Sequence, residues 1–398
     1  MTGSEILSTL LTGWRRCAIV VTLPVALPVT SPPSDLPQTS GDACSMPVTI
    51  RDIAQRAGVS VSTASRALNK KDDVSKETRE RVLAAARELN YAVNLHARAL
   101  AGATGKTVGF VLYDSSTAFH AAMARGVEDV ATAHGYSLIV CNTGGAPDAE
   151  LRAHQMLREK RVDGVLINSV QSGSEPLRRL AAEGIPYVLL NRRMDDLDAD
   201  YVIVDYRRGT HMATTYLLEL GHRRILLQTA EPEHPPVRER VVGYRQALEQ
   251  YGVAFDPDLL LQCSHGLMST HSRVLEVMTS LHPAPTAILA YNDLWAIPVL
   301  SVLHELGLRV PDDVAVVGHN DLEFARFLIP PLTTIAHPVY EMGRRAAEIL
   351  FRKISQSEDE PWRPQRIILE PRLITRQSSG AAVAVAGLGP AGAKQHIT

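Results

Sequence analysis

The sequence predicts a small N-terminal all-α domain followed by a large α/β domain of two lobes. Residues 46–104 contain short amphipathic segments separated by Gly and by residues that cap helices. Residues 105–376 alternate apolar runs with amphipathic stretches, the pattern of a parallel sheet flanked by helices. The chain has 398 residues, which at roughly 100–200 residues per domain allows two or three domains.

The composition is that of an ordinary globular protein, with 45% hydrophobic and 21% charged residues. The four cysteines lack the paired spacing of metal ligands and are too few for a disulfide scaffold. We therefore expect no metal and no cofactor, and the composition fits the reducing cytoplasm. The formal net charge of −2 argues, taken alone, against a nucleic-acid binder, because such domains are usually basic.

The first 45 residues differ from the rest of the chain. Residues 17–30 are apolar and follow two arginines, as in a secretory signal, but they are too short to span a membrane, which takes about 20 residues. Residues 31–45 have the Pro- and Ser-rich composition of a disordered segment. A secretory signal, an interaction tail and upstream sequence ahead of a start at Met46 are the alternatives. We favour the last, because Met46 directly precedes the first clear helix signal.

Three helices are predicted in residues 46–104. The first follows Thr49 as its cap and has apolar residues at i, i+3, i+4 and i+7, namely Ile50, Ile53, Ala54 and Ala57. Gly58 ends this helix, Ser60 caps a second short helix, and a third follows Ser75. A helix, a turn containing Gly and a second helix form the spacing of a helix-turn-helix unit.

The second helix has a surface that suits a DNA major groove. It exposes short side chains and one arginine: Val61, Ser62, Thr63, Ser65, Arg66 and Asn69. Arginine pairs with guanine, and Ser and Thr reach bases or phosphates. Residues 46–104 hold ten Lys and Arg against six Asp and Glu, a net +4, whereas residues 105–398 carry −5. The basic charge is thus concentrated where phosphate contacts require it. A small helical bundle that binds protein is the alternative.

The segments TIRDIAQRAGVSVSTASRALN (49–69) and VSKETRERVLAAARELNY (74–91) resemble the DNA-binding headpiece of the lactose/galactose repressor (LacI/GalR) family of bacterial regulators. The similarity extends across almost all of residues 47–376. The resemblance implies that the positions of Val61, Ser62 and Arg66 read bases. It implies phosphate contacts from Thr49, Ser60, Thr63, Ser65 and Asn69.

Residues 94–102 resemble the hinge helix of that family, which folds on operator DNA. The resemblance assigns DNA contacts to Asn94 and makes Leu100 the wedge that enters the minor groove. Val93 departs from the family pattern, in which Pro usually precedes Asn94. We expect this change to loosen the approach to the hinge without removing its function.

Two series of apolar runs predict the two lobes of residues 105–376. The expected strands are 107–113, 136–142, 162–168, 185–191, 223–229, 286–292 and 314–320. An amphipathic helix is expected at 337–354, a final pair of strands at 364–376, and a disordered tail at 377–398. Ligands of open α/β sheets bind beyond the carboxyl ends of the strands. The cleft candidates are therefore residues 114–120, 191–193, 292–293 and 319–321.

The resemblance implies that this region is the periplasmic-binding-protein-like effector and dimerisation domain of the same family. The matched effector contacts are Phe119, His120, Asn191, Arg240, Asn292, Asp293 and Asn320, and we add Arg193. Asn320 stands where the family usually has Asp, and His120 where Phe is usual. Together with the two arginines, these changes suit a ligand with negative charge, such as a sugar acid or a sugar phosphate. A plain sugar or a nucleoside is the alternative.

We expect a cytoplasmic, sequence-specific DNA-binding regulator, a repressor controlled by a sugar or sugar derivative bound between the lobes. No catalytic constellation stands out in the sequence, so we do not expect an enzyme. Helix-turn-helix dimers bind two half-sites, which predicts a homodimer on a pseudo-palindromic double-stranded DNA operator and no membrane partner. A secreted solute-binding protein is the runner-up, which the apolar N-terminal segment favours and the helix-turn-helix unit opposes. A sugar-converting enzyme on the same scaffold is a third hypothesis.

Overall fold

The computed structural model describes residues 18–21, 48–68, 73–89, 91, 105–168, 173–230, 235–263, 266–356 and 361–380. These residues fall into two compact units: a headpiece within residues 24–105, and a core formed by the residues from 106 onwards together with the strand at 18–21. Most of the N-terminal extension and of the C-terminal tail lies outside the described residues, as do Asn69 and the predicted hinge with Asn94 and Leu100.

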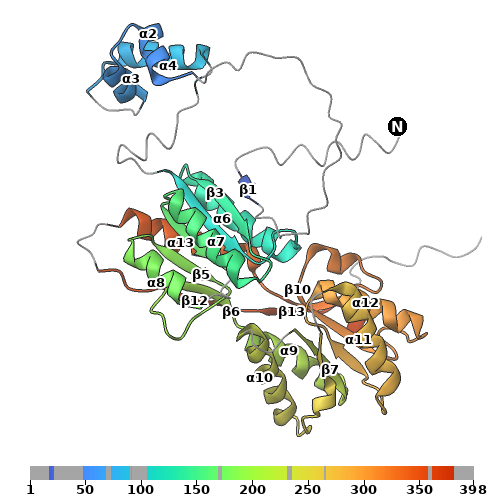
Figure 1. The fold of residues 1–398 in the computed structure, drawn as a ribbon. Coiled ribbons are helices and arrows are strands. Elements are labelled where there is room, and N and C mark those ends of the chain that lie inside the picture. Colours follow the sequence, from blue (N-terminus) through green and yellow to red (C-terminus); the bar gives the residue numbers. More distant parts are fainter. Residues whose placement is uncertain are drawn as a thin grey trace, which may run out of the picture. The chain divides into compact units, whose positions relative to one another are not determined.

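The headpiece is a three-helix unit, as predicted (Figure 1). Its helices are α2 (Ile50–Ala57), α3 (Val61–Leu68) and α4 (Lys76–Glu88). Ile53, Ala64 and Val82, one from each helix, are fully buried in the shared core. Small alanines on α3 allow this short helix to approach the other two closely, and the larger side chains of α3 are left on its outer face.

Local interactions fix the ends of these helices. The Thr49 backbone N–H donates to Asp52 Oδ2 at 2.7 Å, and this bond lowers the pKa of Asp52. Gly58 ends α2 at φ 65°, in the left-handed region that favours glycine. Ser60 Oγ accepts from the Thr63 N–H at 3.1 Å and so caps α3. The turn that leads into α3 is therefore encoded locally.

One lobe of the core, the N lobe, is built on a parallel sheet in the order β1-β3-β2-β4-β5-β6-β12. Its strands are β1 (Ala18–Val21), β2 (Thr107–Leu112), β3 (Ser137–Asn142), β4 (Gly164–Ile167), β5 (Tyr187–Leu190), β6 (Tyr201–Val204) and β12 (Arg366–Leu369). Its helices are α6 (Ala118–Ala133), α7 (Pro147–Glu159), α8 (Glu175–Ala182) and α13 (Val339–Ser355). β1, from the extension, is the edge strand and pairs in parallel with β3.

The two faces of this sheet have separate cores because side chains alternate along each strand. Along β2, Phe110 packs with α6 and α13, whereas Val111 packs with α7 and α8. Both faces are covered, and the strands are accordingly almost continuous apolar runs. This arrangement leaves the carboxyl edge of the sheet as the place where polar side chains collect.

The second lobe, the C lobe, has a six-stranded sheet in the order β13-β11-β10-β9-β7-β8. Its strands are β7 (Ile225–Thr229), β8 (Leu260–Gln262), β9 (Ala287–Leu289), β10 (Ala315–Asn320), β11 (Thr333–Ala336) and β13 (Arg372–Ile374). Its elements of helix are α9 (Tyr206–Glu219), α10 (Pro235–Gln250), α11 (Leu267–Ser280), α12 (Asp293–Glu305), and the short 3-10 turns η2 (Pro257–Leu259), η3 (Glu323–Phe327) and η4 (Gln377–Ser379). Only β13 runs antiparallel to its neighbour.

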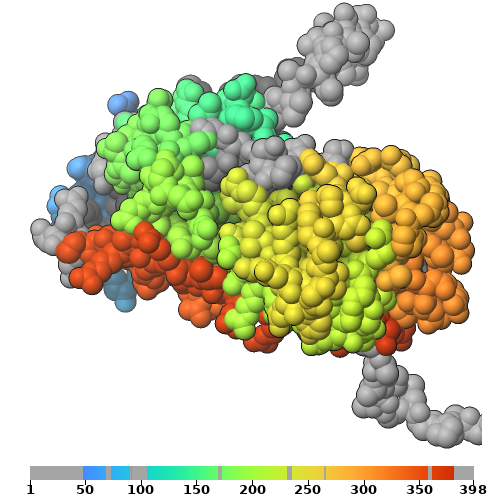
Figure 2. All heavy atoms as spheres, turned by 90° about the horizontal axis from the view of Figure 1, so that it is seen from below, coloured from blue at the N-terminus to red at the C-terminus, as the bar shows by residue number. Residues whose placement is uncertain are grey.

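The chain passes between the lobes three times: after β6, after β11, and between β12 and β13. The expected final pair of strands is therefore divided, since β12 joins the N lobe and β13 joins the C lobe. In Figure 2 the C-terminal segment, coloured orange to red, runs along one edge of the core from the green lobe towards the yellow one. These connections hold the two sheet edges opposite each other.

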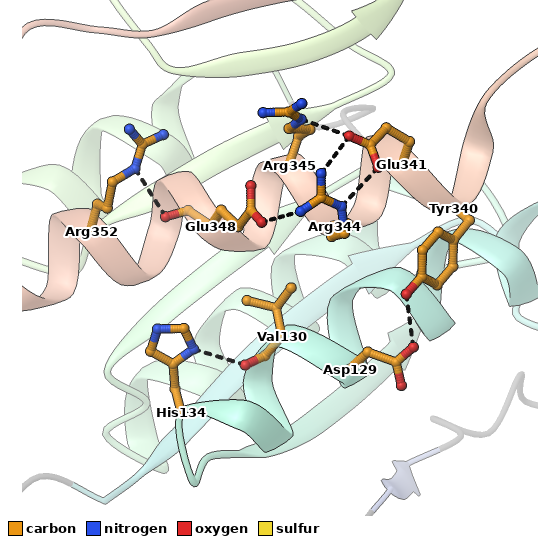
Figure 3. Close-up of polar contacts among 9 residues, drawn as sticks. All are labelled: Asp129, Val130, His134, Tyr340, Glu341, Arg344, Arg345, Glu348 and Arg352. Atoms are coloured by element: carbon orange, nitrogen blue, oxygen red, sulfur yellow. Dashed lines mark hydrogen bonds and ion pairs between the residues drawn. The ribbon is translucent and has the colours of Figure 1, made fainter.

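In the N lobe, α6 and α13 lie side by side with polar contacts on their outer faces (Figure 3). Tyr340 Oη donates to Asp129 Oδ2 at 3.0 Å, which joins the two helices. Arg344 lies between Glu341 and Glu348 on the outer face of α13 and donates to both carboxylates. These ion pairs lie at half-buried positions on the surface of the helix, where such pairs each contribute little to stability, so the buried apolar face provides most of the packing energy.

Candidate functional site

The headpiece presents the predicted base-reading residues on the outer face of α3. Ala64 and Ala67 are fully buried, and this turns Val61, Ser62 and Arg66 outwards. Val61 is 44% exposed although it is apolar. The Arg66 guanidinium forms an ion pair with Asp73. A small apolar group, a hydroxyl and a guanidinium thus form one surface, which is suited to base edges in a major groove.

The predicted phosphate-contacting residues surround this face. Thr49 and Ser60 are exposed, and Thr63 and Ser65 are half-buried. The Ser60 hydroxyl lies 2.8 Å from both the Ser62 and Thr63 hydroxyls, so the three form a cluster at the start of α3. Backbone N–H groups and hydroxyls at a helix N-terminus are suitable partners for a phosphate.

The core contains a cavity of about 510 Å³ at the strand ends of the two lobes. Six predicted effector contacts line it: Phe119, His120, Asn191, Arg240, Asn292 and Asn320. A second hollow of about 690 Å³ lies on the outside of the N lobe between α7 and α8. It is larger but is lined by exposed, mutually paired charges such as Arg158 with Glu183. The cavity at the strand ends has the mixture of aromatic and polar groups typical of a ligand site.

Two predicted contacts do not line the cavity. Arg193 is 47% exposed and its guanidinium lies 3.6 Å from Glu239. Arg192 lines the cavity instead. Asn191 has φ 54°, and this left-handed residue turns the chain so that the residue next to it, rather than Arg193, reaches the ligand space. The expectation for Arg193 is corrected to Arg192.

Asp293 is the other exception, because it is buried behind the cavity. It accepts from Thr334 Oγ1 at 2.6 Å and from the Leu322 N–H at 2.7 Å. Burial raises its pKa to about 7. A Cβ on Gly318 would lie 2.3 Å from Asp293 Oδ1, so the glycine is required here. Asp293 positions the start of α12 and the loop after β10, and its neighbour Asn292 caps α12 through the Trp295 N–H at 2.9 Å.

The N-lobe wall of the cavity is formed by aromatic rings. The rings of Phe119 and His120 are 5.3 Å apart, and Tyr113 stacks on His120 at 6.3 Å. His120 Nδ1 lies 2.7 Å from Thr117 Oγ1. Burial lowers the pKa of His120, so its imidazole is neutral at pH 7. Asn168, at the end of β4, completes this wall.

The C-lobe wall is organised around Arg240, which is 4% exposed. Its guanidinium lies between two tyrosine rings, 4.7 Å from the centroid of Tyr206 and 4.4 Å from that of Tyr291. Its Nη1 donates to the Tyr291 carbonyl oxygen. Tyr206 Oη donates to Asn191 Oδ1 at 2.7 Å and so connects this wall with the end of β5. Cation–π contacts of this kind fix the guanidinium plane.

Two buried histidines lie behind Arg240. His319, the last residue but one of β10, has its Nδ1 3.1 Å from the Ala290 carbonyl oxygen, and the ring of His337 lies 5.8 Å away. Among the described residues, neither ring nitrogen of His337 has a hydrogen-bond partner. Burial, reinforced by the positive charge of Arg240, holds the pKa of both histidines well below the ordinary value of 6.5.

These histidines predict a loss of stability in acid. Protons bind the unfolded histidines below pH 6.5 but not the folded ones, so the free energy of unfolding falls as the pH drops, by up to about 1.4 kcal/mol per pH unit for each histidine. Asp293, whose folded pKa is raised, opposes this between pH 7 and 4. We expect His337→Leu to lose less stability than wild type between pH 7 and 5.5 in urea titrations. If His337→Leu loses as much stability as wild type between pH 7 and 5.5, His337 is not a source of the acid sensitivity. The control is His304→Leu, at an exposed position.

Several lining residues were not singled out from the sequence. They are Tyr113, Asn168, Tyr206, Tyr291 and Trp295. Most of them lie within two residues after the end of a strand, as Asn168 follows β4. The rule that ligands bind beyond strand ends identifies them once β4 and β6 are placed. Trp295, one turn into α12, gives no such signal in the sequence.

Comparison with known proteins agrees with this architecture. The family model of bacterial regulatory proteins of the lacI family matches residues 49–94, and that of periplasmic binding protein-like domains matches residues 214–379. The chain is 35% identical over 334 residues to the HTH-type transcriptional repressor PurR of Vibrio campbellii, covering 83% of this chain and 98% of the relative. It is 33% identical to the HTH-type transcriptional regulator DegA of Bacillus subtilis over 338 residues, 84% of this chain and 98% of that one.

Solved structures show the same likeness. The lac repressor dimer bound to operator and the anti-inducer ONPF superposes with a TM-score of 0.74 at 27% identity, covering 84% of this chain and 99% of the other. The complex of the transcriptional regulator CelR with cellobiose has a TM-score of 0.63 at 31% identity, covering 83% and 99%. Each of these alignments extends beyond the core to most of the chain.

A helix-turn-helix headpiece joined to a two-lobed binding core defines a DNA-binding transcriptional regulator controlled by a small-molecule effector. The chain belongs to the LacI family of bacterial regulatory proteins. It is not an enzyme, and the alternative of a secreted solute-binding protein is excluded because the similarity includes the headpiece. Within the described residues, no helix is both long and apolar enough to cross a bilayer.

Proposed function

We propose that the chain is a repressor that binds a pseudo-palindromic operator as a homodimer and responds to a sugar-like ligand in the cavity between its lobes. The cavity is the observation that carries this proposal, because both lobes contribute aromatic rings and polar groups to it. Its volume of about 510 Å³ lies within the usual range for small-molecule sites. DNA is the target, so we propose that the protein acts in the cytoplasm.

The lining favours a ring-shaped ligand with hydroxyl groups. Phe119 and Trp295, on opposite lobes, offer flat apolar surfaces, while Asn191, Asn292 and Asn320 offer amide groups. Apolar faces and a few polar groups that fix orientation are what a sugar requires. The solved relatives agree in kind, since one contains cellobiose and another, a LacI family regulator from Enterococcus faecium, contains ribose.

We propose that ligand binding changes DNA affinity through closure of the lobes. A ligand that contacts both walls stabilises one arrangement of the lobes over the other. The shift in the equilibrium between the two arrangements equals the difference between the free energies with which the ligand binds each of them. By linkage, operator DNA changes ligand affinity by the same factor. The headpiece residues Val61, Ser62 and Arg66 read bases, and the hydroxyls around them contact phosphates.

The proposal is tested by DNA binding with and without ligand. Fluorescence anisotropy with an operator taken from the chain's own promoter region should give saturable, sequence-specific binding at fixed salt. A ligand that raises the melting temperature of the chain should also change operator affinity. Sequence-specific DNA binding that no stabilising ligand alters would contradict control through the cavity.

The C lobe has an exposed apolar segment suited to a dimer interface. Phe327, the last residue of η3, is 73% exposed, and Ile329, between η3 and β11, is 93% exposed. Exposed apolar patches on folded domains mark interaction sites, and the lac repressor structure is a dimer bound to operator. We propose that a second copy of the chain covers this segment.

The substitution Ile329→Asp tests this interface. It places an unpaired charge in each half of the interface, and we expect the dimer to weaken by about 100-fold or more. Sedimentation velocity should show monomers at concentrations where wild type is dimeric, with a parallel loss of operator affinity. Leu151→Asp, at an exposed apolar position on the N lobe, is the matched control. A variant that remains fully dimeric would place the interface elsewhere.

A further inference from the structure

The hollow on the outside of the N lobe, between α7 and α8, is a second space of ligand size. Its volume is about 690 Å³, and it shares no lining residue with the cavity between the lobes. Small-molecule sites have volumes in the same range. α7 contributes Leu151, an apolar side chain that is 45% exposed, and α8 contributes Pro176. The hollow therefore offers apolar contact as well as charge.

A buried histidine on α7 lines this hollow without a hydrogen-bond partner. His154 is 3% exposed, and neither of its ring nitrogens has a partner among the described residues. Glu150 Oε1, one turn earlier on α7, lies 3.8 Å from Nε2, which is beyond hydrogen-bond distance. A buried polar group without a partner is costly. This imidazole is therefore suited to a ligand that supplies the missing hydrogen bond.

The carboxylate of Glu150 decides what the imidazole can offer. It is fully buried, and Arg192 is a nearby counter-charge that keeps it ionised. A negative charge beside Nε2 favours the tautomer of His154 that carries its proton on this nitrogen. Nδ1 then has a free lone pair and acts as an acceptor. His154 therefore favours a ligand with an N–H or O–H donor.

The charged side chains around the hollow favour a cation as that donor. Both guanidiniums of the lining already have carboxylate partners, since Arg158 pairs with Glu183, and Arg179 pairs with Glu175 at 3.1 Å. The third carboxylate, that of Glu159, forms no ion pair in the part of the chain that the structure describes. Across the described ranges, no group of three or more His, Cys, Asp and Glu is arranged to hold a metal ion. An organic cation fits these observations.

We propose that the hollow binds a small organic amine, whose N–H groups donate to His154 and Glu159 while its hydrocarbon chain packs on Leu151. The Gln155 amide donates to Glu159 Oε1 at 2.8 Å and leaves Oε2 to the ligand. An ammonium group has three N–H donors and no acceptor, and charge-assisted hydrogen bonds are about twice as strong as neutral ones. The site lies outside the effector cavity and goes beyond the function proposed above.

Calorimetric titration of the full chain with amines and their neutral counterparts tests this site. The probes are butylamine and putrescine, paired with butanol and butanediol of the same chain length, and butyrate is the corresponding anion. We expect at least one amine to bind at least about 10-fold more tightly than its neutral partner, and butyrate not to bind. Equal binding of amine and alcohol, no binding of either amine, or a preference for butyrate would overturn the inference.

Variants place the amine in the hollow. Glu159→Gln, at an exposed position, keeps the shape of the side chain, and His154→Leu removes the unpartnered nitrogens. Each should weaken amine binding by about 10-fold. Glu249→Gln, at an exposed position on α10, removes the same charge from the C lobe and should bind as wild type does. Wild-type affinity in either α7 variant, or an equal loss in Glu249→Gln, would place the amine elsewhere. Operator binding without amine should be unchanged in Glu159→Gln, so failure of this site leaves the proposed function intact.

Discussion

Replacing Arg66 with alanine is expected to weaken operator binding by about 1–3 kcal/mol for each headpiece and to relax specificity at one base pair. Arg66 is the cation on the outer face of α3, which the buried Ala64 and Ala67 hold in place. A bidentate contact from arginine to guanine is lost in the variant, and alanine supplies no replacement. Because a dimer has two headpieces, the loss in affinity of the dimer is about twice this value when both half-sites are equivalent.

The measurement is a set of anisotropy titrations on the operator and on single-base variants of it, at one salt concentration. Arg87→Ala is the matched control, because it removes the same charge from α4, where the side chain donates to the Leu83 carbonyl oxygen. It should change affinity similarly for all sequences. Arg66→Ala with wild-type affinity, or with equal losses on every sequence, would show that α3 does not read bases through this residue.

The ion pair between Arg66 and Asp73 sharpens this expectation. A base edge must compete with the Asp73 carboxylate for the guanidinium. We therefore infer that Asp73 lowers the affinity of Arg66 for non-target sequences, which cannot offer a bidentate acceptor. Both side chains are more than 40% exposed, so the ion pair itself adds little to headpiece stability.

Replacing Gly343 with alanine is expected to destabilise the N lobe by about 1–3 kcal/mol. A Cβ at this position would lie 2.1 Å from the Met123 carbonyl oxygen on α6. The obstacle is backbone, so no side-chain rotation relieves it and the two helices must separate. On the facing helix, a Cβ on Gly126 would lie 2.2 Å from the Tyr340 carbonyl oxygen. The two glycines thus set the distance between α6 and α13.

The expected loss of stability in Gly343→Ala is opposite in sign to the usual effect of replacing glycine with alanine in a helix. Alanine is favoured over glycine within a helix by about 1 kcal/mol, so a loss of stability isolates the cost of the close helix contact. Urea unfolding of the core measures it. Gly209→Ala on α9 is the matched control, because its Cβ would meet the Ile335 side chain at 3.2 Å rather than backbone. A Gly343→Ala variant that is more stable than wild type by about 1 kcal/mol, the full gain from helix propensity, would show that α6 and α13 can separate at no cost.

Local patterns sufficed for the headpiece and for most of the core elements. The caps at Thr49 and Ser60 and the left-handed Gly58 are encoded within a few residues, so the helices begin and end where the sequence predicts. The apolar runs of the core predict strands such as β2 and β10 because parallel strands buried on both faces are continuously apolar. The cleft followed from the position of strand ends.

The tertiary structure decided what depends on distant segments. Arg192 and Arg193 both fall within the range 191–193 that the sequence predicts for the cleft, and only the tertiary structure shows that Arg192 lines the cavity and Arg193 does not. The sequence predicts Asp293 as a ligand contact, but its carboxylate accepts hydrogen bonds from Thr334 and Leu322 instead. These two donors come from elements distant in the sequence. The strands at 366–369 and 372–374 are adjacent in sequence, yet they join different sheets.

The sequence by itself therefore predicted the helix-turn-helix unit and the strands of the core, because helix periodicity, capping and strand burial are properties of short segments. The class of protein followed from the resemblance of residues 49–69 and 74–91 to the LacI/GalR family. Only the tertiary structure decided how the cavity is charged. The environment of Arg240 is made by Tyr206, Tyr291, His319 and His337 from four separate elements. Long-range packing brings these side chains together around Arg240. Short sequence patterns therefore cannot predict that this buried cation has no anionic group among these neighbours.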